Sequence, residues 1–298
     1  MLTMRALSIV AVVLAGTIIC GSGCKKHSTS IISAFNEGTA LRTPSERYDV
    51  PRAPLSRQHQ PNKPTTAANF PTISIVLDDV GLRRNAHDPF LAIRGLRGAL
   101  SWALLPGAVH SIPIARELVD LGESLLLHMP MEPAKAQHIA PHLGRYLLSR
   151  HTHEEISAIL SAAYETFPLE IRPHLAGLNN HQGSRLTMSH THMSAVVASV
   201  KARNGYILDS RTSGDSVLVQ SALEQSVPAR SRDVFLDNIR EIEAIREQLT
   251  IAEDVALANG SAIAICHPYP ETAQALAQWV HERNQTIKLV PVRALMRK

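Results

Sequence analysis

From residue 72 to the end of the chain, short apolar segments alternate with longer amphipathic segments. This alternation constrains the fold more than any other feature of the sequence. The apolar segments have the length of buried strands, and the amphipathic segments carry helix signals at their ends. Such an order predicts parallel βα units arranged around one sheet or barrel, an α/β fold.

The expected elements can be placed along the chain from these two patterns. Strands are predicted at residues 73–77, 99–105, 124–128, 175–178, 206–209, 229–236, 262–266 and 287–290. Helices are predicted at residues 112–121, 152–167, 193–203, 239–259 and 272–283. Thr152 and Glu155 have the spacing of a capping box, and Gly260 follows the long helix as a helix-ending residue.

The first 24 residues have the pattern of an export signal peptide. Arg5 precedes an apolar run over residues 6–19, which is too short for a comfortable membrane span. The small residues 21–23 precede Cys24 and resemble a bacterial lipoprotein cleavage site, which would make Cys24 the lipidated first residue. An uncleaved anchor is the alternative. We therefore expect a periplasmic protein whose contact with the membrane is limited to its leader or a lipid anchor.

Residues 25–70 differ in composition from the rest of the chain. Prolines stand among Ser, Thr, Arg, Gln and Asn, without apolar periodicity. This composition predicts a disordered linker. The expected organisation is a leader over 1–24, a linker over 25–70 and one domain over 71–298.

Composition also argues against some partners. The net charge is +4 with scattered Lys and Arg, and only 4% of residues are aromatic. We therefore expect no nucleic-acid partner, because neither a basic stripe nor a stacking platform is visible. Cys266 lies in an apolar segment and is predicted to be a buried core residue.

Polar side chains stand at the ends of five predicted strands. The carboxyl ends of parallel strands open on the same face of the fold, so these groups can converge although they are distant in sequence. They are Asp78 and Asp79, His128, Asn179 to His181, Asp209, and His267. The sequence therefore predicts a polar site at this face.

His128 stands four residues before Glu132 in the segment LLHMPMEP. The prolines forbid a regular helix here. Carboxylate and imidazole are ligand types that suit a zinc-like divalent ion. Alternatively, Glu132 pairs with an arginine such as Arg185 or Arg211. The other paired histidines, at 138 and 142, 151 and 153, and 190 and 192, are expected at exposed loops and helix starts rather than in a second metal site.

Five ordered segments resemble the motifs of the divergent polysaccharide deacetylase family, a remote relative of the metal-dependent polysaccharide deacetylases. They are SIVLDDVG, LLHMPMEP, GLNNHQGSRLT, YILDSRTS and AICHPYPET, within about residues 72–295. The resemblance implies a distorted (β/α) barrel of about seven parallel strands. It also implies a hydrolase of carbohydrate metabolism that acts on an N-acetylated envelope polysaccharide or peptidoglycan fragment.

The resemblance also implies a metal site, for which we expect zinc. Asp78 would act as the base and Asp79 as a metal ligand, together with His128. Glu132 occupies the position at which the metal-dependent relatives carry a second histidine. The third protein ligand would then come from either His181 or Glu132.

The remaining motifs imply acid and orienting groups. His267 would protonate the leaving group, and Asp209 would orient catalytic residues. The Arg-Pro-Pro-Tyr type motif of the metal-dependent relatives is absent, and NNHQGSR stands near its place. Asn180, Arg185 and Arg211 are predicted to bind the substrate.

Two functions remain open. A metal-dependent deacetylase is favoured by the joint presence of Asp78, Asp79, His128 and His267. A non-catalytic glycan-binding or scaffolding envelope protein is favoured by Glu132 and by the absent third motif. We adopt the enzyme as the working hypothesis. Asp237 is placed by the sequence either toward the site or in a turn.

Overall fold

The computed structural model describes residues 70–296, all of which belong to the compact unit Arg47–Lys298. The predicted leader, Cys24 and the predicted linker up to residue 69 lie outside the described residues. None of the described helices has the length and apolar character needed to cross a membrane.

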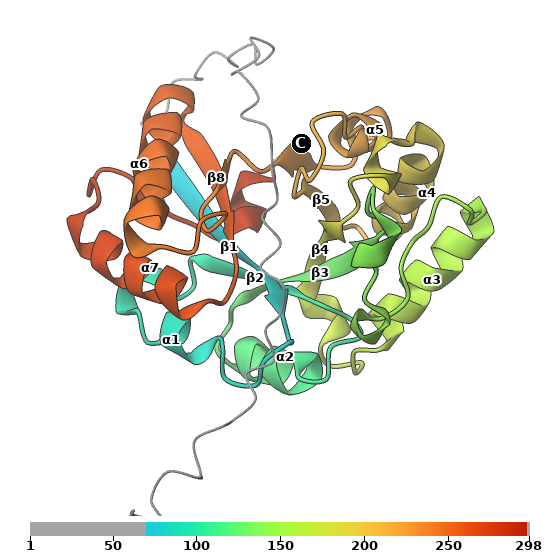
Figure 1. Cartoon of the computed structure of the whole chain (residues 1–298), viewed down its shortest axis with the longest axis horizontal. Helices are drawn as coiled ribbons and strands as arrows, with labels where there is room; N and C mark the ends of the chain where they lie inside the picture. The colour runs from blue at the N-terminus through green and yellow to red at the C-terminus, as the bar shows by residue number, and fades with distance from the viewer. Residues whose placement is uncertain (1–69, 297–298) are drawn as a thin grey trace, which may run out of the picture. The chain divides into compact units, whose positions relative to one another are not determined.

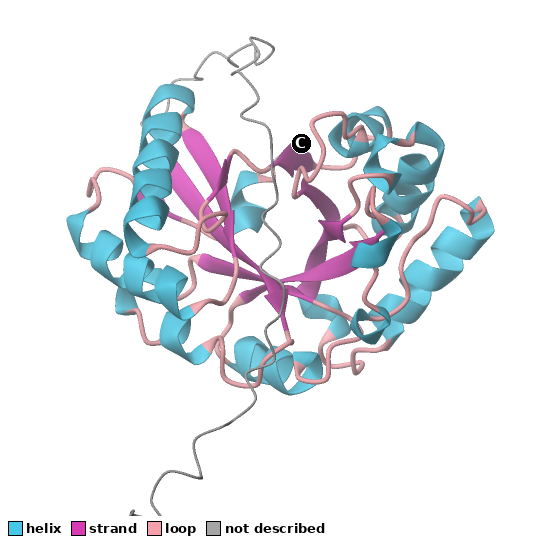
Figure 2. Cartoon of the chain, in the orientation of Figure 1, coloured by secondary structure: helices cyan, strands magenta, loops and turns pink. Residues whose placement is uncertain are grey.

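A parallel sheet forms the centre of this unit (Figure 1, Figure 2). The hydrogen-bonded order is β6-β5-β4-β3-β2-β1-β8-β7, and β9 pairs with β1. All pairs are parallel. The strands are β1 (Thr72–Val80), β2 (Leu100–Leu104), β3 (Ser124–Met131), β4 (Leu175–Gln182), β5 (Tyr206–Asp209), β6 (Ala229–Ser231), β7 (Val234–Phe235), β8 (Ser261–Cys266) and β9 (Lys288–Leu289).

The chain itself joins the two edges of the sheet. Arg232 donates its backbone N–H to Asp209 O at the end of β5, whereas the next residue, Asp233, donates to Ile263 O in β8. The one strand predicted at 229–236 is therefore two short strands, because the chain changes partner between these residues. Because β6 and β7 do not pair with each other, the parallel sheet forms a distorted half-barrel, which confirms the predicted α/β fold class.

Helices surround the sheet (Figure 1). They are α1 (Asp88–Leu91), α2 (Ser111–Asp120), α3 (His153–Glu165), α4 (His190–Lys201), α5 (Leu218–Glu224), α6 (Ile242–Asn259) and α7 (Pro270–Glu282). The capping box of Thr152 and Glu155 is confirmed at the start of α3. Gly260 ends α6 with φ of +81°, also as predicted. The sequence prediction missed α1 and α5, because helices of four and seven residues are too short to show a clear period.

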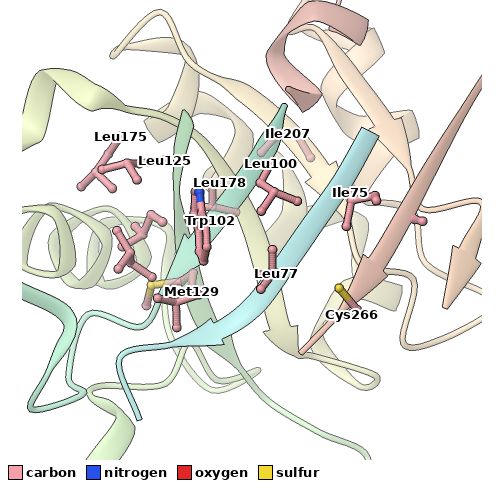
Figure 3. Close-up of a cluster of buried hydrophobic side chains, with 14 of the residues drawn as sticks. Ile75, Leu77, Leu100, Trp102, Leu125, Met129, Leu175, Leu178, Ile207 and Cys266 are labelled. Carbon is pink, nitrogen blue, oxygen red and sulfur yellow. The ribbon is translucent and has the colours of Figure 1, made fainter. Parts of the chain in front are cut away.

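Apolar side chains cover both faces of the sheet. Along β1, Ile75 and Leu77 belong to the larger core cluster, whereas Val76, between them, belongs to a second cluster. Neighbouring strand residues point to opposite faces, so β1 is buried on both sides. Figure 3 shows part of the larger cluster, including Trp102 and Cys266. Cys266 is a buried free cysteine, as predicted.

Candidate metal and acid–base site

An irregularity at the end of β1 directs two adjacent carboxylates to the same imidazole. Neighbouring residues of a regular strand point to opposite faces. Here the pairing of β1 with β2 shifts register between Leu77 and Val80, and Asp79 has φ of +58°. As a result, Asp78 Oδ2 lies 3.7 Å and Asp79 Oδ1 lies 3.1 Å from His128 Nε2.

Asp79, His128 and His181 form the candidate metal site. Asp79 Oδ1 lies 3.1 Å from His128 Nε2 and 2.8 Å from His181 Nδ1. One ligand atom from each residue falls within 4.8 Å of the others. A carboxylate and two imidazoles are a donor set that zinc accepts in open catalytic sites. The three residues are therefore able to hold such an ion.

Asn179 fixes the proton position on His128. Its amide nitrogen donates to Asp78 Oδ1 at 2.6 Å, which turns its oxygen toward His128 Nδ1 at 2.9 Å. Because that oxygen only accepts, a ring proton sits on Nδ1, and Nε2 faces Asp79. Nε2 can therefore either donate a second ring proton to Asp79 or, once that proton is lost, share a cation with it. In metal sites, ligand histidines commonly have their second nitrogen fixed in this way.

His181 carries an unsatisfied atom. Its side chain is largely buried, and its Nε2 has no hydrogen-bond partner among the described residues. A buried ring nitrogen without a partner is uncommon in folded proteins. The imidazole of His181 is therefore held at Asp79 through Nδ1, and its Nε2 is unsatisfied. An additional ligand at the site could satisfy this nitrogen.

The two neighbouring carboxyl groups have opposite pKa shifts. Burial raises the pKa of Asp78 and outweighs the attraction of His128 and His267. Burial also acts to raise the pKa of Asp79, but the charge of His181 and the hydrogen bonds from His128 and His181 hold it well below its usual range. Asp79 is therefore suited to be an ionised ligand, and Asp78 is better suited to accept a proton.

His267 is held by Asp237. Its Nδ1 lies 3.0 Å from Asp237 Oδ1, and its backbone N–H donates to Asp237 Oδ2 at 2.6 Å. Thr272 Oγ1 donates to the same Oδ2 at 2.8 Å. Burial acts to lower the pKa of His267, but the charge and hydrogen bond of Asp237, with a contribution from Asp79, raise it to about 9. His267 is therefore protonated at neutral pH, as a general acid requires.

The structure does not bring Asp209 to His267. Asp209 is buried, and its Oδ1 accepts the backbone N–H of Arg211 at 2.7 Å. The reason is topological, since β5 and β8 are not neighbours, whereas Asp237 lies two residues after the end of β7, the strand that pairs with β8. The orienting contact that the resemblance implied for Asp209 is made by Asp237.

Glu132 lies outside the candidate metal site. One of its oxygens accepts the backbone N–H of Ser149 at 2.5 Å, and the other lies 3.5 Å from Arg185 Nε. β3 stays extended through Met131, so Glu132 is displaced from His128 by about 13 Å along the strand. Of the two alternatives for the third ligand, the structure places His181 beside Asp79 and His128.

The three residues predicted to bind substrate occupy different environments. Asn180 is fully buried, where its oxygen accepts the backbone N–H of Ser210 and its nitrogen donates to Gln182 O. It connects β4 with the end of β5 and does not face solvent. Arg185 and Arg211 are exposed. Substrate contact therefore stays a prediction for these two arginines.

Sequence reasoning gave no role to two residues that complete the site. Asn179 links His128 to Asp78, and Ser210 Oγ lies 3.3 Å from Asp78 Oδ2. Their only signal in the sequence is that each directly adjoins a recognised strand end. In the sequence alone, neither the amide of Asn179 nor the hydroxyl of Ser210 indicates that it orients Asp78.

Comparison with known proteins identifies the family. Residues 75–296 match the model of the divergent polysaccharide deacetylase family, and the chain belongs to it. The uncharacterized protein YibQ of Escherichia coli K12 is 34% identical over 224 residues, which cover 75% of this chain and 67% of YibQ. An uncharacterized Haemophilus influenzae protein is 31% identical over 230 residues, 76% of each chain.

A solved structure shares the fold. The crystal structure of the uncharacterized protein ATU2773 from Agrobacterium tumefaciens C58 superimposes with a TM-score of 0.68 at 23% identity. The match covers 78% of this chain and 92% of that one. At this identity the likeness establishes the fold, and the chemistry must be argued from the side chains.

Proposed function

We propose that this protein is a metal-dependent deacetylase that removes acetyl groups from an N-acetylated polysaccharide of the cell envelope. The observation that carries the proposal is the meeting of Asp79, His128 and His181 at one point, with Asp78 and His267 beside them. Family membership supports polysaccharide as the substrate class. The leader-like N-terminus supports a periplasmic location, which cell fractionation would test.

The proposed chemistry assigns one task to each group. A zinc-type ion held by Asp79, His128 and His181 would supply Lewis acidity to the attacking water and the acetamide carbonyl. The Asp78 carboxylate accepts the proton of that water, and its orientation is fixed by Asn179 and Ser210. His267 delivers a proton from Nε2 to the departing amine.

Metal content and acetate release test this proposal together. We expect the purified full chain to bind about one equivalent of zinc, as three converging ligands allow, and to release acetate from N-acetylated glycan. No zinc after reconstitution, or zinc without acetate release from a panel of such glycans, contradicts the enzyme. Glycan binding without turnover would instead support the scaffolding alternative.

Glu132→Gln provides a control on the ligand assignment. The Glu132 carboxylate contacts Ser149 and Arg185 rather than the metal site. We therefore expect this variant to keep its full zinc content by elemental analysis. Its free energy of unfolding should fall by no more than about 1 kcal/mol, since Arg185 is largely exposed and the glutamine oxygen can still accept the Ser149 N–H. Loss of zinc would show that Glu132 moves to become a ligand.

The pH dependence tests the contact between Asp237 and His267. The folded-state pKa of about 9 lies above the usual 6.5, so protonated His267 stabilises the fold most below pH 6.5. That stabilisation is lost as the pH rises through 9, and the acid form needed for turnover is lost with it. In Asp237→Asn the pKa of His267 should fall, because the principal opposing charge is removed.

Rate–pH profiles measure this change. We expect the turnover rate of the wild type to decline on the alkaline side near pH 9. In Asp237→Asn the same decline should occur at a lower pH. An unchanged limb in the variant would show that His267 does not set the alkaline decline. Thr272→Val serves as a control, because it removes one hydrogen bond to Asp237 but leaves the Asp237 charge in place.

A further inference from the structure

The segment between β3 and α3 carries an excess of positive charge. Residues 132–152 contain Lys135, Arg145 and Arg150 against a single acidic residue, Glu132. All three basic side chains are exposed. The deacetylase chemistry proposed above uses none of them, so this charge needs another explanation.

Three arginines lie around Glu132 and His151. Arg185 Nε lies 3.5 Å from Glu132 Oε1. Burial acts to raise the pKa of Glu132, but the Ser149 N–H and the charges of Arg185 and Arg150 lower it. Burial lowers the pKa of His151, and Arg150 and Arg145 lower it further. Arg150 and Arg185 thus neighbour Glu132, and Arg145 and Arg150 neighbour His151. These three residues are here called the arginine cluster.

The arginine cluster lies beside the candidate metal site. Tyr146 directly follows Arg145, and its ring centroid is 6.4 Å from that of His181. Gln182, the residue after His181, donates its side-chain amide to His138 O at 3.1 Å. The basic segment is therefore packed against the end of β4 that carries His181. A glycan that reaches the metal site would pass within reach of these arginines.

Three other arginines of the described residues are each balanced by one carboxylate. Arg116, Arg240 and Arg246 each pair with one glutamate, at 3.3, 3.1 and 2.6 Å. In the arginine cluster, by contrast, Glu132 divides its contacts between the Ser149 N–H and the guanidinium of Arg185, whose side chain is 58% exposed. The cluster therefore carries positive charge that its own carboxylate does not neutralise.

We propose that the arginine cluster binds a carboxylate of the polysaccharide, and that the substrate is an acidic N-acetylated glycan rather than a neutral one. A guanidinium group matches a carboxylate through two parallel hydrogen bonds. A positively charged rim also concentrates anionic ligands near a site. This inference rests on the proposed function for the acetyl chemistry, but its charge preference is measured separately.

Calorimetric titration of the full chain with two tetrasaccharides tests the inference. One is a neutral N-acetylglucosamine tetramer, and the other alternates N-acetylglucosamine with N-acetylmuramic acid, whose lactyl ether bears a carboxylate. We expect wild-type protein to bind the acidic glycan about tenfold more tightly, the order that two exposed ion pairs supply. The preference should disappear in about 1 M salt, where the Debye length is about 3 Å.

Matched variants locate the preference. Arg145→Gln with Arg150→Gln should reduce the affinity for the acidic glycan to that for the neutral one. Arg116→Gln with Arg246→Gln removes the same charge elsewhere and should keep the preference. Should the first variant fold poorly, Arg185→Gln alone is expected to weaken the preference severalfold, because its side chain is largely exposed.

Three outcomes would overturn the inference: equal affinity for both glycans, equal loss in the control variant, or binding of phosphatidylglycerol vesicles in place of the acidic glycan. Glycan titrations with and without zinc distinguish the arginine-cluster inference from the proposed deacetylase function. Acetate release without charge preference refutes the arginine-cluster inference alone. Charge preference without zinc binding or acetate release refutes the proposed deacetylase alone.

Discussion

Asp78→Asn is expected to lower turnover by about a thousandfold while zinc and glycan binding persist. General base catalysis contributes roughly 10²–10⁴ in rate, and an amide cannot accept the proton of the attacking water at neutral pH. The substitution is nearly isosteric, and its oxygen can still accept from Asn179, which donates to Asp78 Oδ1 at 2.6 Å. Steady-state acetate release and elemental analysis measure the two effects.

The combination of results decides what Asp78 does. Retained zinc with lost turnover assigns the base to Asp78. Unchanged turnover would remove Asp78 from the mechanism and leave the raised pKa of this buried carboxyl without a catalytic role. Ser210→Ala is the matched control, since it removes a single hydrogen bond to Asp78 Oδ2 and leaves the carboxylate in place. We expect its effect to be much smaller.

Asp79→Ala is expected to abolish turnover by removing the metal. Asp79 supplies the oxygen shared by His128 and His181, at 3.1 and 2.8 Å. Changes to groups that only support a ligand cost about 10–100-fold in metal affinity or activity, so loss of the ligand itself should cost at least about a hundredfold. Titration with a competing chelator measures this affinity.

His190→Ala is the control for loss of a histidine or carboxylate contact in general. His190 pairs with Glu224 on the surface and lies outside the candidate metal site. It should therefore keep wild-type zinc affinity and turnover. If Asp79→Ala bound zinc as tightly as wild type, the ligand set proposed here would be wrong.

The sequence was sufficient to predict the fold because the signals for each element agreed. The apolar run in β1, the capping box at Thr152 and Gly260 after α6 all stand where the structure has the corresponding element. The division of residues 229–236 could not be predicted. It depends on which neighbouring strand accepts each hydrogen bond, which is a property of the assembled sheet rather than of the local sequence.

The sequence predicted which residues form the candidate site better than it predicted which of them contact one another. Placing polar groups at strand ends brings Asp79, His128 and His181 to one face, but strand order decides which of them touch. Asp237 reaches His267 because β7 pairs with β8, a non-local fact. Glu132 was ambiguous because the prolines exclude a helix after His128 but leave the path of this segment open. Only the extended course of β3 shows that Glu132 is carried away from His128.

At Asp79 the left-handed backbone conformation lowers the stability of the fold, whereas the proposed chemistry requires the carboxylate. A φ of +58° is unfavourable for residues with a Cβ atom by about 1–2 kcal/mol, although Asp tolerates it better than most. Glycine would adopt this conformation without that steric penalty. A sequence optimised for folding alone would place glycine here. The carboxylate is therefore kept against the preference of its own backbone. Greater thermal stability at this position would be obtained only by giving up the ligand.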